Sequence, residues 1–179
     1  MKRFLLLTVL ALTLSTLCAG DKSTLSLAVD LRALDALLLP TLQAKAELRL
    51  GLSDEFALRI PLSLTSDLKY NEVRLWESGL FLDYYPFRGG LCLSVSLVQM
   101  GIFSGPDKPE ASILYLNEVG FGYTWRITKA LYLEPRLVVC DPSGVFEAEY
   151  AQVGRAFPDR SKFRISLLFG WEFLAIPGL

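Results

Sequence analysis

The segment "FLDYYPFRGGLCLSV", Phe81 to Val95, decides the fold. Apolar residues recur at every second position before the connection formed by residues 88–90, and again after it. This period of two is that of a β-strand, whose successive side chains point to opposite faces of the sheet. Two such runs joined by so short a connection containing two glycines predict an antiparallel hairpin with one apolar face.

The same alternation occurs eight times along the chain, and no segment with a helical period competes with it. The predicted strands lie within residues 25–32, 42–51, 56–64, 80–85, 91–97, 113–126, 131–139 and 163–173. Short connections at 53–55, 88–90 and 128–130 alternate with longer ones at 33–41, 65–79, 104–112 and 141–162. Short turns at one end and long loops at the other are typical of outer-membrane barrels. We therefore predict an all-β fold, an eight-stranded antiparallel up-and-down transmembrane β-barrel.

The N-terminal segment "MKRFLLLTVLALTLSTLCAG" has the order of a secretory signal. Basic Lys2 and Arg3 precede an apolar run, and small residues follow it, as a signal peptide requires. We predict a signal peptide over residues 1–20 and a barrel domain over 21–179, in the outer membrane of a diderm bacterium. Lipidation of Cys18 is the alternative for this segment.

The composition excludes several classes of function. Hydrophobic residues make up 52% of the 179 residues and the formal net charge is −1, so the chain lacks the basic face that nucleic-acid binding needs. The chain has no histidine, which removes Ser-His and Cys-His nucleophile pairs and the commonest metal ligand. We expect no enzymatic activity, catalytic residue, cofactor or metal site.

The face opposite the apolar one carries charges of both signs in similar numbers. An eight-stranded barrel has an interior just wide enough for side chains to fill, so charges inside it must pair with one another. We predict an ion-pair network that plugs the lumen. Its members are Asp30, Arg32, Lys45, Glu47, Arg49, Arg59, Asp83, Glu118, Arg126, Glu134, Arg136, Arg164 and Glu172.

Aromatic residues gather near both ends of the apolar faces, as in the two girdles at the membrane interfaces. Tyr84, Trp125, Trp171 and Phe173 lie near the short turns, and Phe103, Tyr115 and Phe163 lie near the long loops. The alternative is a soluble periplasmic lipocalin-like binding barrel, in which the aromatic residues fill the core and the charges form a solvated surface.

Some local features of the sequence predict departures from regular strands, and the two cysteines bear on the predicted topology. Pro61 and Pro135 fall inside predicted strands, where each indicates a bulge or an early strand end. The fifth strand loses its phase at residues 98–99, which indicates another bulge. Cys92 and Cys140 lie at opposite ends of the predicted barrel, too far apart for a disulfide, so we predict two free thiols.

Three segments resemble the small eight-stranded outer-membrane barrels of the OmpA-domain, OmpX and OmpW-like group. They are "LDYYPFRGGLCLSV", "GFGYTWRITKALYLEPRL" and "FRISLLFGWEF", the last similar to the C-terminal β-signal with Phe173 as its terminal aromatic residue. This chain departs from that signal by continuing through "LAIPGL". The resemblance implies assembly by the barrel-insertion machinery, and it implies no single activity, because members are structural proteins, adhesins or small-solute channels.

The sequence thus predicts a monomeric integral outer-membrane protein in contact with outer-membrane lipid. We expect it to act as an envelope structural element, or through its outer loops in surface interaction, with loop 141–162 as the site for an extracellular ligand. A narrow channel for small or apolar solutes is the alternative function.

Overall fold

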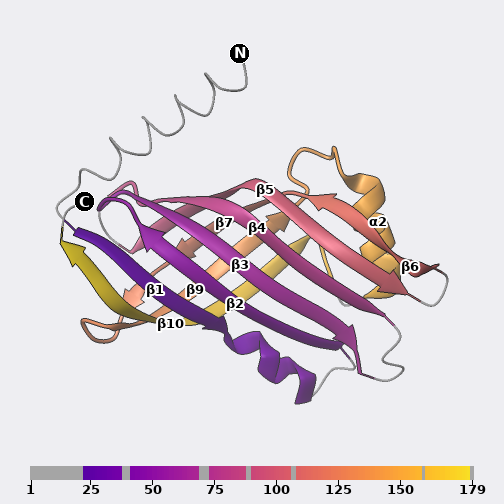
Figure 1. Cartoon of the computed structure of the whole chain (residues 1–179), viewed down its shortest axis with the longest axis horizontal. Coiled ribbons are helices and arrows are strands. Elements are labelled where there is room, and N and C mark those ends of the chain that lie inside the picture. The colour runs from indigo at the N-terminus through magenta and orange to yellow at the C-terminus, as the bar shows by residue number, and fades with distance from the viewer. Residues whose placement is uncertain are drawn as a thin grey trace, which may run out of the picture.

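The computed structural model describes residues 22–37, 41–68, 73–87, 90–105, 108–158 and 160–177. The predicted signal peptide, including Cys18, lies outside the described residues. The strands are β1 (Lys22–Asp30), β2 (Thr41–Gly51), β3 (Phe56–Asp67), β4 (Arg74–Tyr84), β5 (Leu91–Gly105), β6 (Lys108–Leu116), β7 (Glu118–Tyr123), β8 (Trp125–Arg126), β9 (Leu131–Cys140) and β10 (Phe163–Pro177) (Figure 1). A 3-10 helix, η1 (Leu31–Leu37), and an α-helix, α2 (Glu147–Ala156), complete the elements. Neither of these described helices has the length and apolar character needed to cross a membrane.

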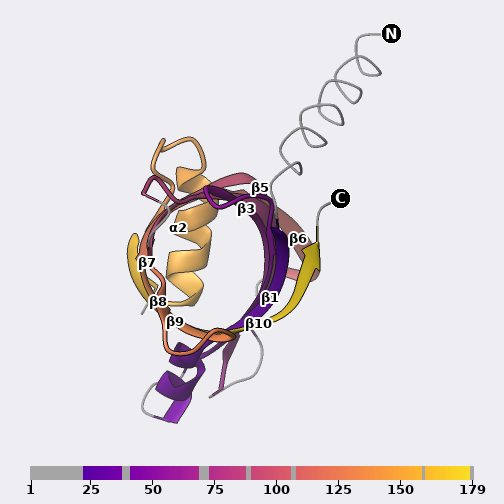
Figure 2. The same cartoon turned by 90° about the vertical axis from the view of Figure 1, so that its left-hand side faces the viewer.

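The strands form one closed antiparallel barrel, which confirms the predicted fold (Figure 2). Pairing follows the order β1-β2-β3-β4-β5-β7-β9-β10, and β1 pairs with β10 to close the ring. Strands β6, β7 and β8 follow one another along a single position in the wall, because β6 and β7 both pair with β5 while β7 and β8 both pair with β9. The wall therefore has eight strand positions. We call the end with connections 52–55, 85–90 and 127–130 the turn end, and the opposite one the helix end.

The two faces of the wall differ sharply in chemistry. Along β2, Leu48 points outward and is exposed, whereas its neighbours Glu47 and Arg49 point inward and are buried. The same division holds along β4 and β9, where Asp83, Glu134 and Arg136 are buried. A soluble lipocalin-like barrel needs the reverse, an apolar interior. The charges therefore line the interior, and the soluble-barrel alternative does not describe this molecule.

One extra residue in β5 produces the bulge predicted near residues 98–99. Leu80 of β4 lies opposite Val98, but the next residue, Phe81, lies opposite Ser96, so Leu97 has no partner of its own. On the other side, the register with β6 and that with β7 differ by the same one residue. The bulge shifts the phase of β5, so that even-numbered residues face outward beyond it.

The two prolines behave differently from the prediction of a bulge or an early strand end. Pro61 pairs with Glu47 of β2 and Pro135 with Leu167 of β10, and both strands continue in unchanged register. Each proline instead interrupts the ladder on its other side, between β3 and β4 and between β7 and β8 along β9. A missing N–H removes one ladder bond toward one neighbour only, and the fixed φ of proline is compatible with extended chain.

Two of the predicted long loops are shorter than the sequence indicated. β4 begins at Arg74 instead of residue 80, and β6 begins at Lys108, paired with Gly105, instead of residue 113. Odd-numbered residues point inward along the whole of β4, but near the helix end the inward Leu75 is apolar and the outward Ser78 is polar. Because only two residues separate β5 from β6 at the helix end, the sorting of short and long connections between the two ends is less strict than predicted.

Helix α2 explains why Leu75, an apolar residue, faces inward. Val153 and Phe157 pack against Leu75 of β4, Phe103 of β5, and Leu114 and Leu116 of β6, which together form a buried apolar cluster. In Figure 1 α2 lies beside β6 at one end of the barrel, and in Figure 2 it lies within the outline of the ring. The helix therefore caps the helix end of the lumen. Acidic residues in its first turn and Arg155 in its last suit the helix dipole.

Candidate functional site

The middle of the barrel holds seven charged side chains, which we call the central cluster. Its members are Lys45, Arg49, Arg59, Arg136, Glu47, Asp83 and Glu134. Alternation along β2, β3, β4 and β9 aims all of them inward, and every carboxylate among them is at most 2% exposed. Glu47 contacts three cations: Lys45 Nζ at 2.8 Å, Arg59 Nη1 at 2.9 Å and Arg136 Nη1 at 3.2 Å.

The other two carboxylates of the central cluster each contact two arginines. Glu134 accepts from Arg49 Nη1 at 2.9 Å and is also bound by Arg136. Asp83 accepts from Arg59 Nε at 3.1 Å and lies 3.6 Å from Arg49 Nε. Because each acid bridges at least two cations, the cluster is one connected network across the lumen. Buried ions are tolerated in this arrangement, since each charge meets several opposite partners.

Neutral side chains complete the hydrogen bonding of the cluster. Ser94 donates to Asp83 at 2.7 Å and accepts from Arg59 Nη2 at 2.5 Å, and Thr124 donates to Glu134 at 2.7 Å. These two residues were not among the predicted members, although the alternation places both on the charged face. The Arg49 guanidinium also donates to the Tyr85 hydroxyl at 2.9 Å. Tyr85 lies in the β4–β5 turn, where burial keeps the pKa of its hydroxyl well above the ordinary value.

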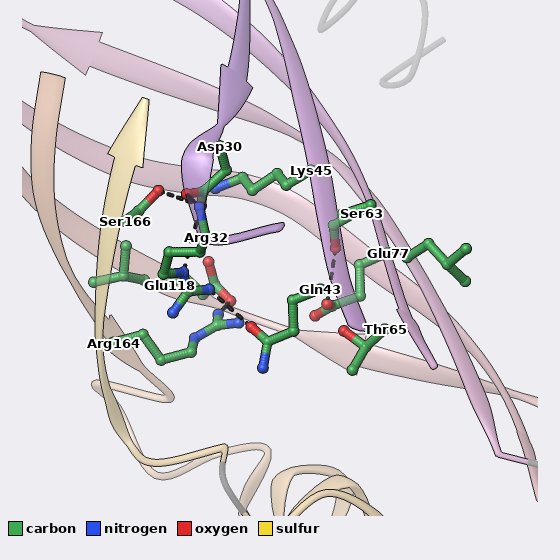
Figure 3. A pocket seen from close by; sticks show the side chains of 13 residues that line it. Asp30, Arg32, Gln43, Lys45, Ser63, Thr65, Glu77, Glu118, Arg164 and Ser166 are labelled. Atoms are coloured by element: carbon green, nitrogen blue, oxygen red, sulfur yellow. Dashed lines mark hydrogen bonds and ion pairs between the residues drawn. The ribbon is translucent and has the colours of Figure 1, made fainter. Parts of the chain in front are cut away.

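A second group of charges lies nearer the helix end (Figure 3). Arg164 of β10 binds Glu118 of β7, and Arg160 Nη2 donates to Glu77 of β4 at 2.5 Å. Asp30 accepts from the Ser166 hydroxyl at 2.6 Å. Glu77 and Arg160 are absent from the predicted network, because both fall in segments that the sequence indicated as loops.

Side chains close the lumen between these two groups. Two interior cavities, each of about 30 Å³, lie beside Lys45, Glu77, Glu118 and Arg164. Each has the volume of about one water molecule in the liquid. At the turn end an open vestibule of about 580 Å³ reaches as far as Arg49 and Tyr132. The central cluster therefore separates the vestibule from the half of the lumen that lies toward the helix end.

The structure brings eleven of the thirteen predicted network residues into the interior. The exceptions are Arg126 and Glu172, which pair at 3.1 Å at the turn end with their side chains 60% and 21% exposed. Arg32 belongs to η1 instead of a strand, and it donates to Gln43 at 2.9 Å. The plug thus consists of residues in the middle of the barrel and toward its helix end, and the Arg126–Glu172 pair lies at the rim of the turn end.

The predicted girdle residues divide in a similar way. Tyr84, Trp125, Trp171 and Phe173 are exposed on the outer wall at the turn end, and Tyr115 and Phe163 are exposed toward the helix end. Phe103 was placed in the girdle wrongly, since its side chain is 7% exposed and packs inside against α2. The bulge at Leu97 turns Phe103 inward. Trp76, which the sequence left in a loop, faces outward from β4.

The remaining chemical groups are few. Cys92 and Cys140 are both buried and free, which confirms the prediction of two thiols. Among the described residues, no three cysteine, aspartate or glutamate side chains come together in a way that could hold a metal ion.

Comparison with known proteins yields a structural match. No family model matches the chain, and no curated protein matches its sequence. The crystal structure of the N-terminal β-barrel domain of OprF from Pseudomonas aeruginosa superposes with a TM-score of 0.57 at 12% identity, covering 86% of this chain and 98% of that one. A de novo designed protein, TMB2.3, covers 87% of this chain at 10% identity with a TM-score of 0.42. The chain therefore has the fold of the OprF N-terminal β-barrel domain, an antiparallel barrel of eight strand positions.

Proposed function

We propose that the chain is an integral outer-membrane barrel with a closed lumen, which serves as a structural element of the envelope. One observation carries the proposal: an apolar outer wall surrounds a connected network of buried ion pairs. The outer wall exposes large apolar side chains on every strand of the ring, among them Leu48, Ile60, Val95, Leu137 and Ile165. Hydrocarbon is the solvent that such a surface suits, and a closed barrel is the only sheet that satisfies its backbone there.

The dimensions of the wall support a membrane location. A transmembrane strand needs about 9 to 11 tilted residues, and β1 has 9 residues while β2 and β4 have 11 each. Trp125 and Trp171 mark one interface and Tyr115 and Phe163 the other. In this orientation the turn end faces the periplasm and α2 faces the exterior. The implied partners are outer-membrane lipid and the barrel-insertion machinery, and the protein is a monomer.

A closed lumen favours the structural role over the channel alternative. The interior cavities have room for about one water molecule each, and the central cluster fills the cross-section beyond the vestibule. Catalysis is a poorer fit, because each carboxylate of the central cluster is engaged by cations. A conducting state would require several buried ion pairs to separate together.

Membrane extraction and gel mobility test the proposal. We expect the protein to stay in the membrane fraction after alkaline washing and to dissolve in detergent. In unheated dodecyl sulfate samples the folded barrel should migrate differently from the boiled chain, because a closed barrel resists unfolding by the detergent. Recovery in the soluble fraction with no heat-dependent shift would overturn the membrane assignment.

A further inference from the structure

A pocket of about 420 Å³ lies between α2 and the ends of β9 and β10. It is separate from the central cluster, and its lining residues include Asp141, Glu147, Tyr150, Gly154, Arg160 and Lys162. Several of these residues, including Glu147 and Lys162, are exposed, so the pocket is open to solvent. Its volume falls in the range of small-molecule sites, about 300 to 1,000 Å³.

The wall of the pocket is stiff on the side of Tyr150. The Tyr150 hydroxyl donates to the Asn117 carbonyl oxygen at 2.6 Å, which ties α2 to the junction of β6 and β7. Burial, with a smaller contribution from Glu118, raises the pKa of Tyr150 above its ordinary value. The hydroxyl therefore stays protonated and keeps donating, so the pocket is held open by a fixed contact.

Glycine 154 leaves space in this wall. Gly154 lies inside α2, and a Cβ built on it meets no atom within 4 Å. Glycine inside a helix costs about 1 kcal/mol relative to alanine, and packing gives no reason for that cost here. The missing side chain keeps the pocket wide, and filling it should leave the fold intact.

The lining of the pocket includes an incompletely satisfied cation, the buried side chain of Arg160. The Arg160 side chain is 3% exposed and its Nη2 binds Glu77, but its Nε and Nη1 have no hydrogen-bond partner among the described residues. Buried donors without acceptors are costly, and guanidinium groups pair well with carboxylate and phosphate oxygens. Lys162 adds a second cation at the mouth. These groups favour an oxyanion in the pocket.

Two acidic residues in the same wall would repel a ligand that carries only negative charge. Asp141 is buried, with Oδ1 accepting from the Phe146 backbone N–H at 3.3 Å, and Glu147 is exposed at the mouth. An ammonium group on the ligand would pair with these carboxylates. We propose that the pocket binds a compact zwitterion, a molecule with an oxyanion toward Arg160 and Lys162 and an ammonium toward Asp141 and Glu147. Short peptides and the phosphoethanolamine of lipid headgroups share this chemistry, and the inference stands whether or not the barrel lies in a membrane.

Calorimetric titration of the full, detergent-refolded chain tests the inference, with the folded state checked by gel mobility. The probes are glycylglycine and phosphoethanolamine, each compared with an analogue of one charge sign, acetate or inorganic phosphate on one side and ethylamine on the other. We expect one-to-one binding of at least one zwitterion, with the analogues of one charge sign weaker by about tenfold or more. Binding of glycylglycine alone would indicate a peptide-like source, and binding of phosphoethanolamine alone a headgroup source.

Variants of the wall locate the binding. Gly154→Leu, which fills the pocket, should weaken binding of the same zwitterion by about tenfold or more, and Lys162→Gln should weaken it by about threefold or more. The matched control is Ala148→Leu, on the same helix at an exposed position outside the pocket, which should bind as the native chain does. The inference is overturned if neither zwitterion binds, if the analogues of one charge sign bind as tightly, or if folded Gly154→Leu binds as the native chain does.

Discussion

Glu134 shows how the buried charges depend on one another. Its side chain is fully buried, bound by Arg49 and Arg136, and it accepts a third hydrogen bond from Thr124. Removing one partner of a buried ion pair leaves uncompensated charge, which is far more costly than never having the pair. The central cluster therefore stabilises the barrel only as a complete set.

The substitution Glu134→Gln tests this dependence. It keeps the shape of the side chain but leaves two buried guanidinium groups short of an anion, so we expect the free energy of unfolding to fall by about 3 to 5 kcal/mol. Urea unfolding of the refolded barrel in lipid vesicles, followed by tryptophan fluorescence, measures the change.

The matched control is Glu172→Gln, which breaks the partly exposed pair with Arg126 at the rim. Water and salt screen such a pair, so the loss should be no more than about 1 kcal/mol. Equal losses for the two variants would show that the central cluster does not act as a buried network.

Gly170 marks a close approach between neighbouring strands. A Cβ on Gly170 would collide with the ring of Tyr132, which β9 places opposite it in the pair Gly170–Tyr132. We expect Gly170→Ala to displace that ring and destabilise the barrel by about 1 to 3 kcal/mol, as overpacking does. The control is Gly154→Ala, which meets open space in α2 and should be neutral or stabilise the protein by up to about 1 kcal/mol. Thermal unfolding in detergent compares the two, and an unaffected Gly170→Ala would contradict the packing described.

At the scale of elements, α2 is the feature that most changes the expected surface. Residues 141–162 had the composition of an outer loop, yet Val153 and Phe157 are buried in the mouth of the barrel. Two apolar residues spaced by four are too few to predict a helix. Sequence reasoning missed their partner Leu75 because it is an apolar residue on the inward face of β4, and it missed Phe103 because the bulge of β5 turns that residue inward.

Phe157→Ala tests whether packing alone holds α2 in place. Removing a buried phenyl ring costs about 3 to 5 kcal/mol, which exceeds what one solvent-exposed helix can supply for itself. We expect trypsin to cleave after Arg155 or Arg160 much faster in the variant while the barrel keeps its heat-dependent gel mobility. Val145→Ala, at an exposed position before the helix, is the control and should be cleaved at the native rate. Native-rate cleavage of Phe157→Ala would mean that polar contacts, such as the Arg160–Glu77 pair and the Tyr150–Asn117 hydrogen bond, hold the segment instead.

The wall itself was largely predictable. Alternation fixed which residues of β2, β3 and β9 face inward, and the bulge in β5 was visible as a loss of phase. The prolines were misjudged because the sequence cannot show which neighbour a missing N–H faces. The start of β4 was missed because Leu75 is apolar on the inward face, where it packs against α2, and Ser78 is polar on the outward face.

At the scale of the whole molecule, the lumen of the barrel is blocked at two places. The central cluster fills the middle of the lumen, and α2 with its apolar cluster covers the helix end. The network was predictable because charges on one face of a narrow barrel must meet. Its exact membership was not, because Glu77 lies in the part of β4 that the sequence indicated as a loop, and Arg160 reaches it from a loop whose conformation depends on the tertiary fold.

Single-channel recording in a planar lipid bilayer tests the closed lumen most directly. The folded protein, identified by its heat-dependent mobility, is reconstituted alongside a boiled sample and detergent alone. We expect no discrete conductance steps from the folded monomer across the ordinary range of voltage. Reproducible unitary steps that appear only with the folded protein would contradict a lumen closed by the central cluster and α2.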